Sequence, residues 1–424
     1  MTTSIHTNEE ILASILIQIT LVILVARAAG ACAAALRQPR AVGEIIAGLM
    51  LGPSLFGYLF PDLSAFLFPT DASQTMWMLA QIGLILLMFQ IGSDFDFRLL
   101  RDKTNRRAVI AVTLASLCFP LILGFTMGHL AAPTLAGDID GLSFSLFMAV
   151  AMAITAVPIL GRILAEYRLT RTRIGVIAIS SAAGNDVIGW IILALIAATV
   201  SAGFSLTGFS LQIAGLGALM AGMFVLGRPL AGWLIRRFPP DDLSLSPVLI
   251  ACVIALIFLA GVATQKLGIF TIFGGFLVGL LFHAHTAFVD AWRRTIGQFV
   301  LVFFLPIFFT LTGLRTNLLG LDTVSDWLWC GAFFAASVVS KIGPVYLAGR
   351  LSGLGRDESA ALGVLMNTRA LMELIVLNIG LSMGVIPQDV FTMMVIMAVG
   401  TTVMTGPLIN RISSITTDGP RHAA

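Results

Sequence analysis

The chain is dominated by long apolar runs that are separated by short polar loops. About thirteen of these runs have the length that an α-helix needs to cross a bilayer, roughly 20 residues. They cover residues 10–28, 41–59, 75–92, 108–130, 143–165, 174–200, 208–234, 246–265, 269–287, 296–314, 327–349, 359–384 and 389–410. Because 58% of the residues are apolar and 11% are charged, the composition excludes a soluble globular domain. The sequence therefore predicts an all-α, multi-pass membrane protein.

The basic residues follow a strict alternation along the loops. Nearly all of the 25 Lys and Arg residues lie in every second loop, beginning with the loop after the first run. The opposite loops carry only Lys266 and Arg315. By the positive-inside rule this pattern predicts an odd number of spans in the inner (cell) membrane, with the N-terminus outside and the C-terminus in the cytoplasm. The first ten residues lack the basic segment of a cleaved signal peptide, so we expect the first run to remain as a span.

The whole chain, residues 1–424, is expected to form one membrane transporter domain. Spans one to six occupy residues 10–200, a linker span occupies residues 208–234, and spans eight to thirteen occupy residues 246–410. None of the loops has the composition of a domain linker. Residues 411–424 are expected to form a short cytosolic tail.

One apolar run contains a carboxylate at the depth of the bilayer centre. Asp186 lies roughly twelve residues past Arg173, which corresponds to about 20 Å along a helix. A charged side chain there costs about 2.5 kcal/mol or more and usually faces a polar cavity. Asn185 beside it offers both hydrogen-bond donors and acceptors. We interpret Asp186 as the ion- and proton-binding group of a membrane transporter; the alternative is a structural Asp held by neighbouring hydroxyls.

Two spans carry signals of an interrupted helix. In the fifth span, Pro158 removes a backbone donor and clashes with the preceding turn, which predicts a break or kink. The twelfth span carries the polar sequence of residues 367–369, in the matching place of the second half. An interrupted helix in each half suggests an inverted repeat with the binding site between the two breaks. The alternative is an ordinary proline kink and an unrelated polar patch.

Further charged residues lie inside predicted spans. Lys341 is too deep to reach the interface easily. It could balance the carbonyl ends of broken helices, pair with a carboxylate and be released on transport, or serve as a structural cation that holds helix ends together. Arg369 and Glu373 are spaced i, i+4, which favours a local ion pair with a structural role over a conformational latch. Glu44 is expected to be a partly solvated carboxylate near the cytosolic interface.

Polar oxygens suited to a hard monovalent cation accompany these charges. They come from Thr155, Ser180, Ser181, Asn185, Asn367 and Thr368.

His283 and His285 resemble a small metal pair, but few other ligands stand near them in the sequence, so no transition-metal site is expected. The four Cys residues are spaced as free thiols. No motif indicates an enzyme, a cofactor or nucleic-acid binding.

Several motifs, in order along nearly the whole chain, resemble one transporter family. They are residues 41–54 (AVGEIIAGLMLGPS), 155–160 (TAVPIL), 185–186 (ND), 273–280 (FGGFLVGL), 305–309 (LPIFF), 313–317 (GLRTN) and 366–378 (MNTRALMELIVLN). The chain resembles the monovalent cation/proton antiporters, in the branch of bacterial Na⁺/H⁺ and K⁺/H⁺ antiporters. Its motifs are most similar to those of the CHX-type cation/H⁺ exchangers.

The resemblance implies a thirteen-span homodimer in membrane lipid. It also implies a core domain with two crossed discontinuous helices. This domain would move against a dimer domain in an elevator-type alternating-access cycle. Asp186 would carry the cation and the proton in alternation. From the residues themselves we expect Asn185, Thr155 and Ser181 to bind the ion with it. The residues expected to compensate charge or gate are Lys341, Arg369, Glu373 and Asn367. Lys341 matches a lysine that these antiporters place next to the second crossing helix.

Two departures from the family refine this expectation. Electrogenic members have two adjacent Asp residues where this chain has Asn185 and Asp186, which predicts one-for-one, electroneutral exchange. Potassium-efflux members and plant exchangers carry a large cytosolic domain after the last span. This sequence stops at Ala424, so nucleotide or glutathione gating is not expected in this chain. The sequence does not decide whether the transported cation is Na⁺ or K⁺.

The expected mechanism is competition between a cation and a proton for one buried carboxylate. The main alternative function is sodium-coupled symport of a small organic anion, which could use Arg369 if Glu373 did not occupy it. A passive cation channel and a membrane-embedded enzyme with His283 and His285 as metal ligands are further alternatives.

Overall fold

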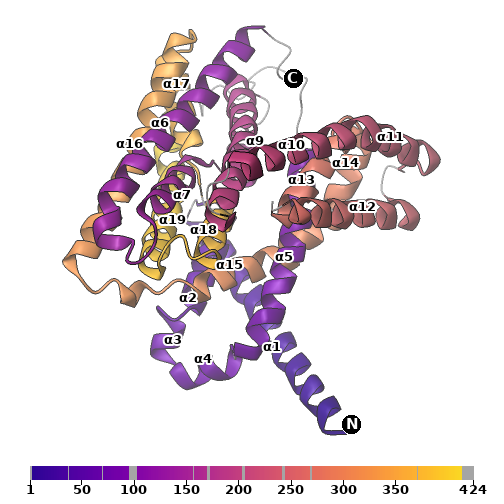
Figure 1. The fold of residues 1–424 in the computed structure, drawn as a ribbon, viewed down its shortest axis with the longest axis vertical. Coiled ribbons are helices and arrows are strands. Elements are labelled where there is room, and N and C mark those ends of the chain that lie inside the picture. Colours follow the sequence, from indigo (N-terminus) through magenta and orange to yellow (C-terminus); the bar gives the residue numbers. More distant parts are fainter. Residues whose placement is uncertain are drawn as a thin grey trace. The chain divides into compact units, whose positions relative to one another are not determined.

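The computed structural model describes residues 2–36, 38–68, 70–94, 103–155, 157–169, 172–202, 206–240, 244–267, 270–369 and 371–412. Within these residues all regular secondary structure is helical (Figure 1). The residues 413–424 of the expected cytosolic tail lie outside the described part, and the last helix ends at Arg411.

The chain divides into two compact units, which are described separately. The first comprises Met1–Arg27, Ala47–Asp96 and Ala197–Leu314, and the second comprises Ala28–Ile46, Phe97–Ile196 and Arg315–Ala424. We call the second the site unit, because it contains the residues that the sequence singles out as an ion site. The helices α1, α2 and α9 pass from one unit to the other.

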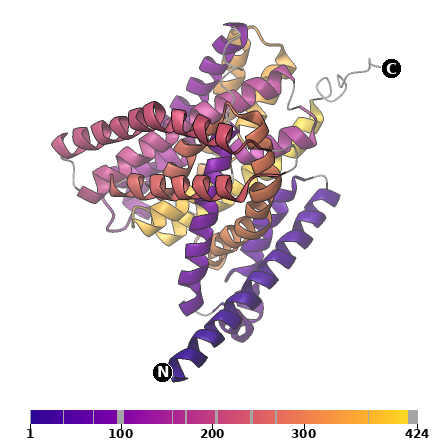
Figure 2. The same ribbon diagram turned by 90° about the vertical axis from the view of Figure 1, so that its right-hand side faces the viewer.

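The helices of the N-terminal half are α1 (Thr2–Ala35), α2 (Arg40–Leu51), α3 (Phe56–Leu59), α4 (Pro61–Leu67), α5 (Thr70–Ser93), α6 (Lys103–Leu135), α7 (Gly141–Ala153), α8 (Val157–Glu166) and α9 (Arg173–Ala202). A long helical element follows, formed by α10 (Leu206–Gly222), a π-helical turn (Met223–Gly227) and α11 (Arg228–Arg237); Figure 2 shows its continuous course.

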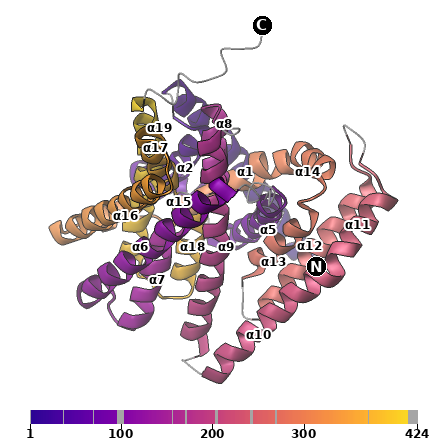
Figure 3. The ribbon, with the colours of Figure 1, turned by 90° about the horizontal axis from the view of Figure 1, so that it is seen from above.

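The C-terminal half contains α12 (Pro247–Lys266), α13 (Thr271–Phe282) and α14 (Thr286–Trp292), then π-helical turns (Arg293–Gly297 and Val300–Phe304) and α15 (Leu305–Leu314). A 3₁₀ turn (Leu318–Gly320) precedes α16 (Val324–Leu351), α17 (Arg356–Met366), α18 (Leu371–Ser382) and α19 (Gln388–Arg411). In the site unit, α6 packs along α7 and α16, and α16 packs along α17 and α19 (Figures 1 and 3).

The helices agree with the spans expected from the sequence. Eleven helices of the described residues are long and apolar enough to cross a membrane. The two shorter apolar helices, Gly141–Ala153 and Thr271–Phe282, stand where the fifth and ninth spans were expected. The expected all-α, multi-pass fold is confirmed.

The glycines of the 273–280 motif explain how closely the first unit packs around α13. A Cβ added to Gly275 or Gly279 would overlap the backbone of α5, at Ile85 and Phe89 respectively. A Cβ added to Gly274 would overlap the backbone of α12 at Ala260. Small residues that let helix backbones touch are the usual means of helix association in membranes. The motif therefore fixes α13 between α5 and α12.

We predict that Gly279→Ala destabilises the protein, because the added methyl group would meet backbone atoms that cannot move independently of α5. The apparent melting temperature of the detergent-solubilised protein should fall by several degrees. Gly331→Ala in α16 is the control, since a Cβ there meets nothing within 4 Å and Ala is the better helix former. Equal melting temperatures for the two variants would contradict this packing.

Candidate functional site

Both helices that were expected to be interrupted are broken, and both lie in the site unit. α7 ends at Ala153 and α8 begins at Val157, so that Pro158 is the second residue of α8. Proline is well tolerated in the first turn of a helix, where its missing N–H has no intrahelical partner. In the second half, α17 ends at Met366 and α18 begins at Leu371.

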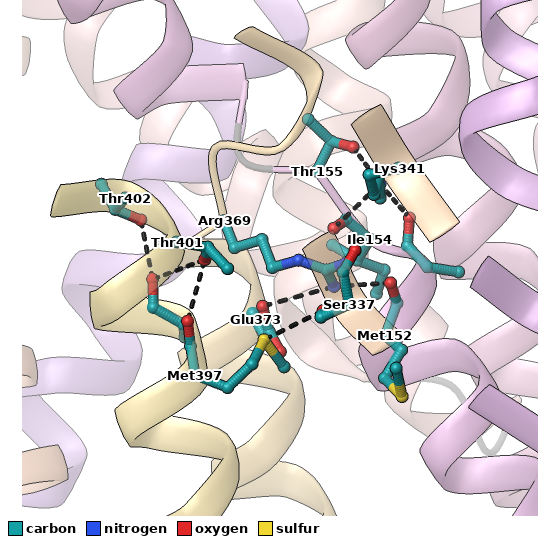
Figure 4. A network of polar contacts seen from close by, with 12 residues as sticks. Met152, Ile154, Thr155, Ser337, Lys341, Arg369, Glu373, Met397, Thr401 and Thr402 are labelled. Carbon is teal, nitrogen blue, oxygen red and sulfur yellow. Dashed lines mark hydrogen bonds and ion pairs between the residues drawn. The ribbon is translucent and has the colours of Figure 1, made fainter. Parts of the chain in front are cut away.

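Two buried cations cap the carbonyl end of α7. The Lys341 ammonium, from α16, donates to the carbonyl oxygens of Ala153 at 2.6 Å and Ile154 at 3.4 Å. The Arg369 guanidinium, from the α17–α18 break, donates to the carbonyl oxygen of Met152 at 2.5 Å (Figure 4). The last carbonyls of a helix have no intrahelical partner and carry the negative end of its dipole. Positive charge here therefore stabilises a helix end inside the membrane.

The hydroxyl of Thr155 connects the two breaks. It accepts hydrogen bonds from Lys341 Nζ at 2.5 Å and from Asn185 Nδ2 at 3.0 Å, and it donates to the carbonyl oxygen of Met366 at 3.4 Å. Figure 4 shows Thr155 facing Lys341 beside the break. One side chain thus joins the end of α7, the end of α17, and the helices α9 and α16.

The amide of Asn185 holds α9 against the first break. Its Nδ2 atom also lies 3.2 Å from the carbonyl oxygen of Ala153 and 3.4 Å from the Ser116 hydroxyl in α6. One turn earlier, the Ser181 hydroxyl donates to the carbonyl oxygen of Val109 in α6 at 3.2 Å. Both side chains therefore act as structural donors in this conformation. The Asn185 Oδ1 atom is buried and has no hydrogen-bond partner among the described residues.

The carboxylate of Asp186 is buried without a partner. Its side chain is 1% exposed, and neither of its oxygens accepts a hydrogen bond from the described part of the chain. Lys341 is the charged group that acts on it electrostatically. Burying an ionised carboxylate without donors is costly, so this group favours an added positive charge, either a cation or a proton.

Arg369 and Glu373 form the expected ion pair, but loosely. Their closest charged atoms are 3.7 Å apart, and both side chains are fully buried. The guanidinium donates its hydrogen bonds to main-chain oxygens instead, including that of Ser337 in α16 at 3.3 Å. Neither oxygen of Glu373 has a hydrogen-bond partner among the described residues. Asn367 donates to the Met404 sulfur at 3.7 Å.

Some expectations are wrong, and some site residues were not foreseen. Glu44 is 2% exposed rather than partly solvated, because α2 packs it against α1, where a Cβ on Gly30 would lie 3.5 Å from it. Ser116 and Ser337 carry no sequence signal, since isolated serines are common in apolar helices.

His283 and His285 are not joined by a third His, Cys, Asp or Glu ligand within the described residues. The structure shows no cluster of three or more His, Cys, Asp or Glu side chains that could hold a metal, within the described ranges. Burial and the nearby His283, Arg236 and Arg228 lower the pKa of His285.

A helical membrane protein with two interrupted helices that meet at buried charges has the architecture of a secondary transporter. Comparison with known families identifies which one. Residues 20–414 match the model of the family described as sodium/hydrogen exchanger, transmembrane. The chain belongs to this family of monovalent cation/proton antiporters, which are transporters and not enzymes.

Relatives from bacteria, plants and fungi support the assignment. The chain is 36% identical to the Na⁺/H⁺ antiporter NhaS4 of Synechocystis sp. over 400 residues, covering 94% of this chain and 97% of the relative. It is 36% identical to cation/H⁺ antiporter 17 of Arabidopsis thaliana, covering 95% of this chain and 48% of the relative. It is 32% identical to K⁺/H⁺ antiporter 1 of Saccharomyces cerevisiae, covering 88% and 43%. The chain thus spans about half the length of the plant relative and slightly less than half of the yeast one.

A solved structure shows the same fold. The sodium proton antiporter MjNhaP1 of Methanocaldococcus jannaschii aligns with a TM-score of 0.63 at 16% identity, covering 96% of this chain and 99% of the antiporter chain. The family and the fold class expected from the sequence are confirmed.

We predict that Lys341→Leu lowers the melting temperature of the detergent-solubilised protein strongly. The substitution removes the donor to the Ile154 carbonyl oxygen, and it removes one of two donors to the Ala153 carbonyl and to the Thr155 hydroxyl. A buried polar group left unpaired costs about 1–3 kcal/mol. Lys266→Leu, at the exposed end of α12, is the matched control and should change the melting temperature little. A Lys341→Leu protein as stable as this control would show that the cap contributes nothing.

Proposed function

We propose that this antiporter exchanges Na⁺ or K⁺ for H⁺ one for one, with Asp186 binding the cation and the proton in alternation. The observation that carries the proposal is the unpartnered carboxylate of Asp186, 1% exposed and with both oxygens free of hydrogen bonds among the described residues. A cation and a proton compete for it because each neutralises the same single charge.

An amide oxygen in the same turn of α9 supports a cation near Asp186. Asn185 Oδ1 is also unpartnered and lies on the adjacent residue. Thr155 and Ser181 already make hydrogen bonds to other helices. Their role is therefore to hold these helices in place around the cation, and not to bind it directly. The relatives are named for Na⁺ in one case and for K⁺ in another, and we propose a hard monovalent cation as substrate.

The buried charges support electroneutral exchange. Of the buried charges in the site unit, Arg369 stands 3.7 Å from Glu373, which leaves the one carboxylate of Asp186 to take up the cation or the proton. A cation or a proton on Asp186 adds the same single positive charge. Replacing the cation by a proton therefore leaves the net charge of the site unit unchanged. An empty site would carry one positive charge less.

The same contacts disfavour anion symport. An anion would need a free cation at the breaks, but the guanidinium of Arg369 is held by Met152, Ser337 and Glu373. Lys341 likewise donates to three oxygens at the end of α7.

The coupling of the site to the two membrane faces follows from the family resemblance. We propose that the site unit moves relative to the other unit within a homodimer, with the N-terminus outside and the C-terminus in the cytoplasm. Because Thr155 and Arg369 each connect the two broken helices within one unit, these helices would move together. Only an occupied, neutralised Asp186 would cross cheaply, which prevents leak.

We predict that Asp186→Asn abolishes exchange. In proteoliposomes with an internal pH dye and an imposed pH gradient, addition of Na⁺, K⁺, Li⁺ or Rb⁺ should move protons with the native protein. The variant should give the signal of protein-free liposomes. Asp62→Asn in the exposed α4 is the control for the same chemical change and should retain exchange. Cation-dependent proton movement by the Asp186→Asn protein would remove Asp186 from the mechanism.

We also predict that the initial exchange rate is insensitive to membrane potential. The same proteoliposomes would be assayed at imposed potentials of either sign, with the most active cation of the series. Equal rates support one-for-one exchange at Asp186. A rate that follows the potential would show that a second group carries an extra proton, and Glu373 would then be the first candidate.

A further inference from the structure

The indole of Trp190 is a buried hydrogen-bond donor without an acceptor. The side chain is 2% exposed, and its Nε1 atom has no partner among the described residues. Buried indole N–H groups usually find an acceptor, and an unpaired one calls for an explanation.

Trp190 stands one helical turn after Asp186 on the same face of α9. Residues four apart on a helix are neighbours. Helical side chains also lean toward the N-terminus, so a residue covers the turn before its own. Trp190 therefore occupies the helix position next to that of Asp186, although the two side chains make no hydrogen bond with each other in this structure. An unpaired donor and a carboxylate with two unpaired oxygens are thus adjacent on one helix.

The other polar groups around Asp186 are engaged elsewhere or are acceptors. The Asn185 amide nitrogen serves the α7 break, and Lys341 donates to Ala153, Ile154 and Thr155. The polar side chains of α6 that reach α9, Thr113 and Ser116, are neutral. Lys341 is the charged group that acts on Asp186, and it also interacts with Arg369 and Glu373.

We infer that Trp190 is a positioning residue for exchange, whose indole N–H donates to the Asp186 carboxylate when this group is ionised or holds the cation. This inference rests on the proposed function of Asp186. A carboxylate that binds a cation keeps lone pairs free for one N–H donor, and hydrogen bonds to an ionised acceptor are about twice as strong as neutral ones. The indole therefore favours the cation over the proton and sets the pH range in which the cation wins.

Trp190→Phe tests this role because it removes the donor and keeps an aromatic side chain. Exchange would be measured in proteoliposomes as a function of cation concentration and pH. The expected result is a roughly tenfold rise in the apparent KM for the cation, since a tenfold change is the size of one hydrogen bond to a charged group. The pH profile should shift by about one unit toward alkaline pH, and the rate at saturating cation should stay within about twofold.

Trp292→Phe is the matched control. Trp292 is also buried with an unpaired Nε1, but it belongs to the first unit, where its ring packs 4.7 Å from that of Phe89. Its substitution should leave both the apparent KM and the pH profile unchanged. An equal shift in the two variants would show a general effect of losing a buried indole and would overturn the inference.

A second replacement guards against a folding defect in Trp190→Phe. Incorporating benzothienylalanine at position 190 keeps the bicyclic shape and exchanges the N–H for sulfur. The same shifts in KM and pH profile are expected; native values would overturn the inference. Asp186→Asn, measured alongside, separates the two ideas. If Asp186→Asn is inactive and the Trp190 variants behave as native, only the inference fails, whereas exchange by Asp186→Asn refutes the proposed function and the inference with it.

Discussion

The cationic cap on the carbonyl end of α7 is the interaction on which the rest of the site depends. A helix that stops inside a membrane exposes carbonyl oxygens where there is no water to bind them. Lys341 and Arg369 donate to the last three carbonyls before and within the break. Since both cations are fully buried, they in turn need negative charge nearby. Asp186 and Glu373 supply this charge, so that the broken helix and the buried acids stabilise one another.

Much of this arrangement could be predicted from the sequence. Pro158 marks the first break because proline cannot continue a helix from the preceding turn, and α8 begins one residue before it. The depth of Lys341 indicated a partner inside the membrane, and the carbonyl end of a broken helix was one of the roles considered. The apolar runs defined thirteen positions, and at these the described part of the chain has eleven long helices and two short apolar ones.

The contacts between distant segments were beyond the reach of sequence patterns. Thr155 and Met366 are 211 residues apart, and no periodicity indicates that a hydroxyl in one break serves the carbonyl end of the other. Glu44 was misjudged for a similar reason: one turn from Arg40 it looks interfacial, yet the close approach of α1 and α2 buries it. Such burial depends on tertiary packing, which the local sequence does not encode by itself.

Most hydrogen-bond donors of the site are satisfied and several of its side-chain acceptors are not, and this difference determines what the site can bind. Nearly every strong donor near the breaks, from Lys341, Arg369 and Asn185, binds a main-chain or hydroxyl oxygen. The oxygens of Asp186 and Asn185 Oδ1 remain without a donor in the described part of the chain. A site whose carbonyls are satisfied but whose carboxylate lacks donors favours a species that brings only positive charge. Sodium or potassium ions and protons are such species, and this is the physical basis of the competition proposed for Asp186.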